Sequence, residues 1–305
     1  MQLTQWQSTI VGSISIILWG TLALLSQLAG PIPPFQLLAL TFGIAFLLML
    51  TKWAIFKQSL ITIAKQPPLA WFIGIGGLFG FHLCYFFAIK NAPIVDVSLI
   101  SYLWPLFIVL FSSLLPNETL LKRYIVGAIV AFFGCWLLIS NNNASLNLQY
   151  SIGYIAAFGC ALIWSGYSVA SRFIKNVPTD TVGLFCGCVA LLATIFHLLL
   201  EEANWQLNLF QWLSIIGLGI GPIGIAFFTW DHGVKHGNLQ LLSVLAYSTP
   251  LISTIILILF NQATATINVL FACIAIVVGA LIAMPTRKGH LKNSCRNDDL
   301  IDAAD

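Results

Sequence analysis

The sequence is divided into apolar runs long enough to cross a bilayer, and this feature constrains the fold more than any other. A membrane-spanning helix needs about 20 apolar residues, because each residue adds about 1.5 Å along the axis. Short connections rich in Pro, Gly and Asn separate the runs, and none is long enough for a soluble catalytic domain. The ten predicted spans are 9–29, 35–51, 69–89, 94–115, 121–140, 151–171, 181–200, 209–230, 238–260 and 266–284.

Composition supports this interpretation. Of the 305 residues, 59% are hydrophobic and only 8% are charged, whereas a soluble domain carries about 25% charge. The chain is therefore expected to be a polytopic, all-α membrane protein that contacts lipid and does not bind nucleic acid. Its seven cysteines have neither zinc-finger nor CxxC spacing, so they are interpreted as packing residues, and neither a metal nor a cofactor is expected. The first run lacks a cleavage site and is predicted to be a span, not a signal peptide.

A shift of 145 residues superimposes the second half of the sequence on the first without a gap. Such internal repeats are typical of secondary transporters. The shift predicts a first repeat at 1–145, a second repeat at 146–286 and a poorly ordered polar tail at 287–305. Identical residues coincide in the pairs Trp19 and Trp164, Ser26 and Ser171, Pro33 and Pro178, Gly74 and Gly219, Gly76 and Gly221, Lys90 and Lys235, Ser98 and Ser243, Tyr102 and Tyr247, Pro105 and Pro250, and Gly134 and Gly279.

The positions of Lys and Arg predict the orientation. With the N-terminus in the cytoplasm, 12 of these 13 residues fall on the inner side and only Lys90 falls outside. Cytoplasmic loops carry such an excess of positive charge, so both termini are predicted to be cytoplasmic. Because each repeat has five spans, the second repeat must be inverted relative to the first, an arrangement that permits alternating access.

Polar and aromatic residues recur on single faces of several predicted spans, and these faces are expected to line a central cavity. Polar groups at membrane depth are costly unless they face protein or water. For the serines alone, close helix packing is the better explanation, whereas the Tyr, Trp and His positions favour a cavity. The residues placed there are Trp19, His82, Tyr85, Ser98, Tyr102, Trp164, Ser168, Trp230 and Tyr247, with Ser101 on the same face as Ser98 and Tyr102.

Breaks are predicted in the two spans that contain Pro105 and Pro250. Each proline removes one backbone hydrogen bond and frees a carbonyl. Paired breaks in inverted repeats indicate a site near the bilayer midplane. Gly76, Gly80 and Gly221 belong to glycine-rich spans in which close helix contact, and movement of one helix past another, are expected.

Catalytic carboxylates and nucleophiles are missing from the predicted spans. No Asp or Glu lies deep in a span, and there is no HExxH motif, no aspartate pair and no GxSG motif. An enzyme is therefore not expected, and downhill transport is expected to run without a proton gradient. Hydroxyls and aromatic rings suit a neutral or zwitterionic solute, and His82 is interpreted mainly as a contact to that solute.

The motifs of the chain resemble the drug/metabolite transporter superfamily with tandem EamA-type domains, over residues 9–284. Within it, Phe81-His82-x-x-Tyr85-Phe86 and Tyr102-Leu103-Trp104-Pro105 are similar to the aromatic amino acid exporter branch. The resemblance implies export of aromatic and other neutral amino acids across a bacterial inner membrane. It also implies that Trp104 joins Trp19, His82, Tyr85, Tyr102 and Trp164 in the cavity. One departure is Ala263, which occupies the position equivalent to Glu118.

Two other functions remain open at this stage. The first is a multidrug or nucleotide-sugar carrier of the same superfamily. The second is a membrane enzyme or receptor, against which the missing catalytic pairs and the short loops argue. A small-molecule solute is the expected partner, and a monomer is the expected state.

Overall fold

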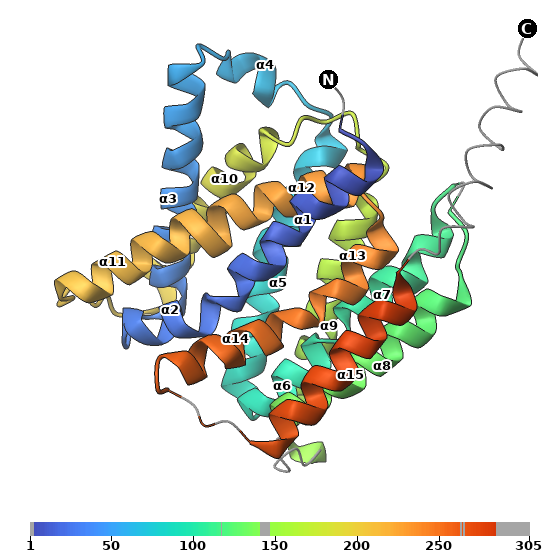
Figure 1. Cartoon of the computed structure of the whole chain (residues 1–305). Coiled ribbons are helices and arrows are strands. Elements are labelled where there is room, and N and C mark those ends of the chain that lie inside the picture. The colour runs from blue at the N-terminus through green and yellow to red at the C-terminus, as the bar shows by residue number, and fades with distance from the viewer. Residues whose placement is uncertain (1–2, 117, 141–146, 263, 265, 285–305) are drawn as a thin grey trace, which may run out of the picture.

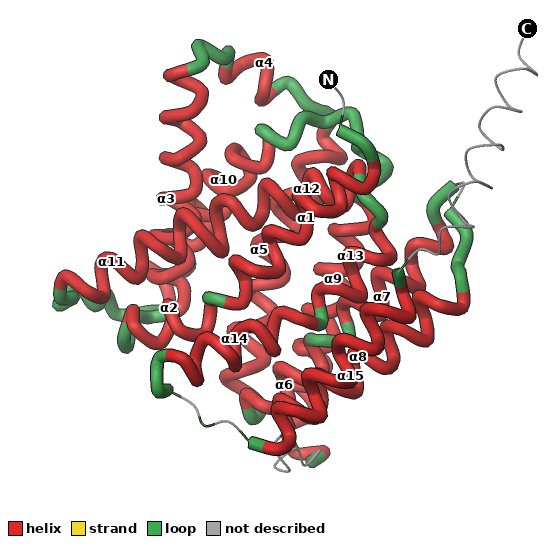
Figure 2. The backbone as a smooth tube through the Cα atoms, viewed as in Figure 1, coloured by secondary structure: helices red, strands yellow, loops and turns green. Residues whose placement is uncertain are grey.

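The computed structural model describes residues 3–116, 118–140, 147–262, 264 and 266–284, and within these residues the chain forms helices without any strand (Figures 1 and 2). The predicted tail at 287–305 lies outside the described residues. Nine helical segments of the described part are long and apolar enough to cross a membrane. A further apolar helix, α15 (Ile267–Ala283), has 17 residues.

The first repeat contains five of these segments and one short connecting helix. Two of its helices begin with proline at the first position, where a missing N–H costs nothing and φ is already suitable. The five segments are α1 (Gln5–Gly20) with α2 (Leu22–Ala29), α3 (Pro34–Ile55), α5 (Pro68–Asn91), α6 (Ile94–Ser101) with α7 (Trp104–Phe111) and η1 (Ser112–Leu114), and α8 (Lys122–Ser140). The short helix α4 (Leu60–Ala64) lies between α3 and α5.

The second repeat follows the same order. Asn208 caps its third helical segment, since its side-chain oxygen accepts from the Gln211 backbone amide and the Gln211 side-chain oxygen accepts from the Asn208 backbone amide. The segments are η2 (Leu148–Tyr150) with α9 (Ser151–Ala170), α10 (Thr181–Leu200), α11 (Leu209–Leu218) with η3 (Gly219–Ile225) and α12 (Ala226–His236), α13 (Leu239–Ala246) with α14 (Ser248–Leu259), and α15.

The two repeats pack against each other in pairs that the 145-residue shift relates. Helix α5 packs on α9, and α1 packs on α12; the shift converts the first pair into the second. Helix α3 packs on α10 and α8 packs on α15, and each of these pairs contains both copies of one span. The repeats are therefore interlocked, and a central space is bounded by helices from both.

Small residues permit the close contact of α8 with α15. A Cβ built on Gly127 would lie 2.6 Å from the carbonyl oxygen of Gly279, and one built on Gly134 would lie 2.9 Å from the Cβ of Ala275. Such packing of small residues is the usual way in which membrane helices approach closely. The two helices run side by side in Figure 1.

The bundle has two ends, which we name after residues that mark them. The Gly30 end contains the turn between α2 and α3 and the turn between α5 and α6. The Lys235 end contains α4, the start of α1 and the turn between α12 and α13, all of which lie toward the top of Figure 1. Successive spans alternate in direction between these ends.

Candidate functional site

A cavity of about 860 Å³ lies between the two repeats and extends toward the Gly30 end. Ile94, at the start of α6, lines it and is 60% exposed, so the cavity reaches the surface there. Its wall includes residues of α1, α2, α3, α5, α6, α8, α9 and α14. No Asp, Glu, Lys or Arg of the described residues lines it.

Seven of the ten residues predicted to contact solute line this cavity. They come from four different segments of the chain, which shows that the fold brings the predicted faces together. They are Trp19 on α1, His82 and Tyr85 on α5, Ser98 on α6, Tyr102 and Trp104 at the break after α6, and Trp164 on α9.

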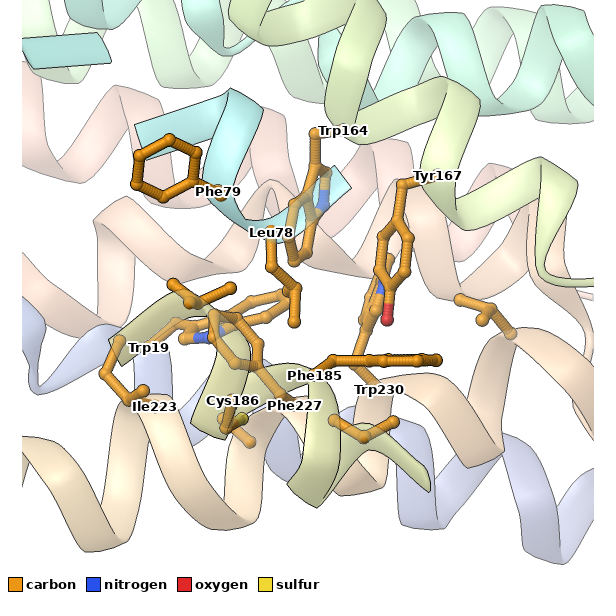
Figure 3. Close-up of a cluster of buried hydrophobic side chains, with 14 of the residues drawn as sticks. Trp19, Leu78, Phe79, Trp164, Tyr167, Phe185, Cys186, Ile223, Phe227 and Trp230 are labelled. Carbon is orange, nitrogen blue, oxygen red and sulfur yellow. The ribbon is translucent and has the colours of Figure 1, made fainter. Parts of the chain in front are cut away.

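Four tryptophans close the cavity toward the Lys235 end. Trp19, Trp104, Trp164 and Trp230 form a cluster in which every pair of rings is in contact, with centroids 5.1–6.4 Å apart. Most pairs meet edge to face or tilted, as the quadrupoles of aromatic rings favour. Figure 3 shows three of these rings gathered with Phe227. Trp19, Trp104 and Trp164 line the cavity and form an aromatic floor on which an apolar group could rest, and Trp230 packs behind them.

A distorted helix fixes the position of Trp19. The segment η3 is a π-helix that contains Pro222, which has no N–H and disturbs the helical hydrogen bonds around it. The indole nitrogen of Trp19 donates to the carbonyl oxygen of Pro222 over 3.0 Å. The sequence analysis did not identify this segment, although a proline among Gly219, Gly221 and Gly224 is a signal that could have revealed it.

The predicted helix breaks are present in both repeats. Helix α6 ends at Ser101 and α7 begins at Trp104; α13 ends at Ala246 and α14 begins at Ser248. The hydroxyl of Tyr247 accepts a hydrogen bond of 3.1 Å from the Leu106 amide, which has no helical partner near the start of α7. Tyr247 therefore links the break of its own repeat to the break of the other.

The imidazole of His82 has a defined tautomer. Its Nδ1 atom lies 2.7 Å from the carbonyl oxygen of Leu78, one turn earlier on α5. Because a carbonyl can only accept, Nδ1 carries the proton, and the neutral ring keeps an acceptor lone pair at Nε2. The ring meets Phe42 edge to face with centroids 5.3 Å apart.

Three predicted contact residues lie outside the cavity wall. Trp230 and Ser168 are fully buried on the side of the Lys235 end, where the Trp230 indole donates to the Ser168 hydroxyl over 3.1 Å. Tyr247 is also fully buried. Their roles as contacts to solute remain predictions.

Of the residues predicted to break or gate helices, Pro250 lines the cavity, whereas Pro105 is buried beside it at the start of α7. A Cβ added at Gly76 would meet open space, and one at Gly80 would make only ordinary contact with Ile163. Close contact at α5 is made instead by Gly74, against Phe185, and by Gly77, against Tyr167. Gly221 lies within η3, 3.8 Å from Leu18 when a Cβ is added.

A buried ion pair closes the Lys235 end. Lys235 Nζ lies 2.8 Å from Asp231 Oδ2, and the two side chains are only 2% and 3% exposed. Lys235 also donates to the Val177 carbonyl over 3.0 Å, and the Thr179 hydroxyl donates to the same carboxylate oxygen over 2.7 Å. The pair therefore ties α12 to the connection between α9 and α10.

Other polar contacts at this end join the two repeats, whereas the ion pair and its partners all belong to the second repeat. Lys52 Nζ lies 2.6 Å from Asp180 Oδ1, and the Asn238 side chain donates to the Tyr124 hydroxyl over 2.9 Å. Gln240 donates to the Ser112 hydroxyl over 2.7 Å. The described residues contain no group of three or more His, Cys, Asp or Glu that could hold a metal ion.

Comparison with known proteins agrees with the resemblance seen in the sequence. The profile of the EamA-like transporter family matches residues 7–140 and again 151–284. The aromatic amino acid exporter YddG of Ancylobacter novellus is 42% identical over 278 residues, which are 90% of this chain and 96% of that protein. The exporter of the same name from Salmonella typhimurium is 24% identical over 94% of this chain and its own full length.

A solved crystal structure of a protein with 42% sequence identity has the same fold. The two superimpose with a TM-score of 0.88 over 92% of this chain and 98% of the other. The two matches to the family profile together cover most of the sequence and correspond to the two packed sets of spans. The chain belongs to the EamA-like transporter family.

Proposed function

We propose that this protein exports aromatic and other neutral amino acids across a bacterial inner membrane by alternating access, without a chemical step. The observation that carries the proposal is the central cavity, which has aromatic walls, several hydroxyls and no charged side chain among the described residues. Such a wall suits an apolar side chain with a zwitterionic end. The names of the relatives from Ancylobacter novellus and Salmonella typhimurium support the same substrate class.

The proposal includes ten spans in two inverted repeats, with both termini in the cytoplasm. The 17 residues of α15 correspond to about 26 Å of helix, which is within the range that spans a bilayer when flanking residues adapt. The Lys235 end would then face the cytoplasm and the Gly30 end the outside. The distribution of Lys and Arg supports this orientation.

The function is tested by counterflow of radiolabelled tryptophan into proteoliposomes that contain the purified protein. Accumulation that depends on internal tryptophan and is competed by phenylalanine is expected, with or without a protonophore, since no carboxylate lines the cavity. Absence of competition by both amino acids would instead favour a carrier for other metabolites of the same superfamily. Binding without any movement of solute would favour a receptor.

Alanine at Tyr85, Tyr102 or Trp164 is expected to weaken tryptophan binding roughly tenfold to a hundredfold. Loss of a desolvated aromatic contact costs about 1–3 kcal/mol. Trp212, which stacks on Trp205 near the Gly30 end and does not line the cavity, is the matched control. Unchanged tryptophan affinity in all three variants, measured at equal protein yield, would contradict the assignment of the site.

A further inference from the structure

Two hydroxyls beside the cavity have no hydrogen-bond partner among the described residues. Ser101 and Thr249 both line the cavity, are 5% and 7% exposed, and leave their hydroxyl oxygens shielded and unpaired. The Cys160 thiol is a near neighbour of Ser101, but its contact with the Ser101 hydroxyl lacks hydrogen-bond geometry, and the thiol donates to the Phe81 carbonyl over 3.6 Å. Buried polar groups are nearly always paired, so two unpaired hydroxyls in one cavity indicate a ligand that completes them.

Two threonine hydroxyls in the same wall are already satisfied. Thr41 donates to the Leu37 carbonyl over 2.8 Å, and Thr254 donates to the Pro250 carbonyl over 2.9 Å. These bonds within a helix are the usual solution for Thr in a membrane span. Ser101 and Thr249 differ because each stands at a helix break.

Ser101 lies at the negative end of a helix. It is the last residue of α6, and its carbonyl lacks the usual donor because the residue four positions later is Pro105. The next carbonyl, of Tyr102, loses its helical donor too, since the Leu106 amide bonds Tyr247. Free carbonyls at a helix C-terminus attract a cation, and a serine hydroxyl beside them offers a further acceptor.

Thr249 lies at the positive end of a helix. It is the second residue of α14, which has 12 residues, and its hydroxyl can donate. Pro250, which follows it, has no N–H, so the Thr249 hydroxyl supplies a donor that the backbone of this turn lacks. A helix N-terminus with an adjacent hydroxyl attracts an anion.

We propose that Thr249 binds the carboxylate and Ser101 binds the ammonium group of an amino acid, whose side chain rests on the floor formed by Trp19, Trp104 and Trp164. Rotation about the Cα–Cβ bond turns each hydroxyl from its shielded position toward the ligand. This inference rests on the proposed function and adds an orientation to it. It also explains how a cavity without charged side chains holds a zwitterion.

The inference is tested with Ser101→Ala and Thr249→Val, and with Thr254→Val as the matched control in the same wall. Binding of phenylalanine, phenethylamine (which lacks the carboxylate) and 3-phenylpropionate (which lacks the ammonium group) is measured on purified protein. Thr249→Val is expected to weaken phenylalanine and 3-phenylpropionate about tenfold and to leave phenethylamine unchanged, because a hydrogen bond to a charged group is lost. Ser101→Ala is expected to weaken phenylalanine and phenethylamine and to spare 3-phenylpropionate.

Equal losses for all three ligands in either variant, or no loss, would overturn the orientation. Thr254→Val is expected to bind all three as the wild-type protein does, and a loss there equal to that of Thr249→Val would also overturn it. Binding of phenylalanine and tryptophan to the wild-type protein distinguishes failure of the orientation from failure of the proposed function. If it binds neither phenylalanine nor tryptophan, the proposed function fails; if it binds both and the variants do not discriminate, only the orientation fails.

Discussion

Replacing Lys235 with methionine is expected to lower the free energy of unfolding by about 3–5 kcal/mol, because the change leaves the Asp231 carboxylate buried without its cation. Both side chains are almost fully buried, so solvent cannot take over the role of the lost partner. Thr179 still donates to the carboxylate, but a single neutral hydrogen bond offsets little of a buried charge. The measurement is chemical denaturation of the purified protein in detergent.

The repeat supplies the matched control. Lys90 is the residue equivalent to Lys235, and it is exposed at the Gly30 end. Lys90→Met should therefore change the free energy of unfolding by no more than about 0.5 kcal/mol. The double variant Asp231→Asn with Lys235→Met should recover most of the stability, since no unpaired charge remains. Equal stability of Lys235→Met and Lys90→Met would show that the buried pair does not hold the Lys235 end together.

The sequence was sufficient to predict the helical character of the chain, the duplication and seven of the residues that line the cavity. Hydropathy identifies spans because lipid excludes unpaired backbone, and a spacing of three or four residues places Ser98 and Tyr102 on one face of a predicted span. The buried partnership of Asp231 with Lys235 was not predicted. Their spacing of four residues permits an ion pair on a helix, but burial depends on what the connection after α9 packs against.

The side on which the cavity opens could not be predicted for a different reason. The two repeats are similar in sequence, so the sequence does not distinguish whether a residue or its 145-shifted partner lines the site. In the conformation of the bundle, one member of several such pairs lines the cavity and the other is buried. At the Gly30 end Ser26, Tyr85 and Tyr102 line the cavity, whereas their partners Ser171, Trp230 and Tyr247 are at most 1% exposed.

The other half-spans show the same difference between a residue that lines the cavity and its buried 145-shifted partner. Helix α6 lines the cavity through Ser98, and its partner Ser243 on α13 is fully buried; α14 lines it through Thr254, and the partner Val109 on α7 is fully buried. Only residues near the centre, such as Trp19 and Trp164, line it in both repeats. Two inverted repeats that exchange their conformations would bury the first set of residues and expose the second. In the proposed mechanism, such an exchange would account for the position of Ser168, Trp230 and Tyr247 outside the cavity.

An exchange of accessible faces is therefore the second expected result. In a cysteine-free background, Ser26→Cys should react with a membrane-impermeant thiol reagent from outside the cell, because Ser26 is exposed and lines the cavity. Ser171→Cys should be protected in this conformation, since Ser171 is 1% exposed. Reaction rates follow the population of the open form. Adding Lys52→Met with Asp180→Asn removes an ion pair that joins the two repeats at the Lys235 end, and should loosen that end and favour the opposite conformation.

In that background the rate at Ser171→Cys, measured from the cytoplasmic side in inverted vesicles, should rise about threefold, which corresponds to a shift of about 0.6 kcal/mol between the two conformations, as expected for a partly exposed ion pair. The rate at Ser26→Cys should fall at the same time, because one conformation gains at the expense of the other. Ser59→Cys, exposed beside α4, is the control that should react equally in both backgrounds. A rise at Ser171→Cys without any fall at Ser26→Cys would indicate local loosening of the Lys235 end instead of an exchange between two states, and reaction of Ser171→Cys from outside the cell would contradict the orientation itself.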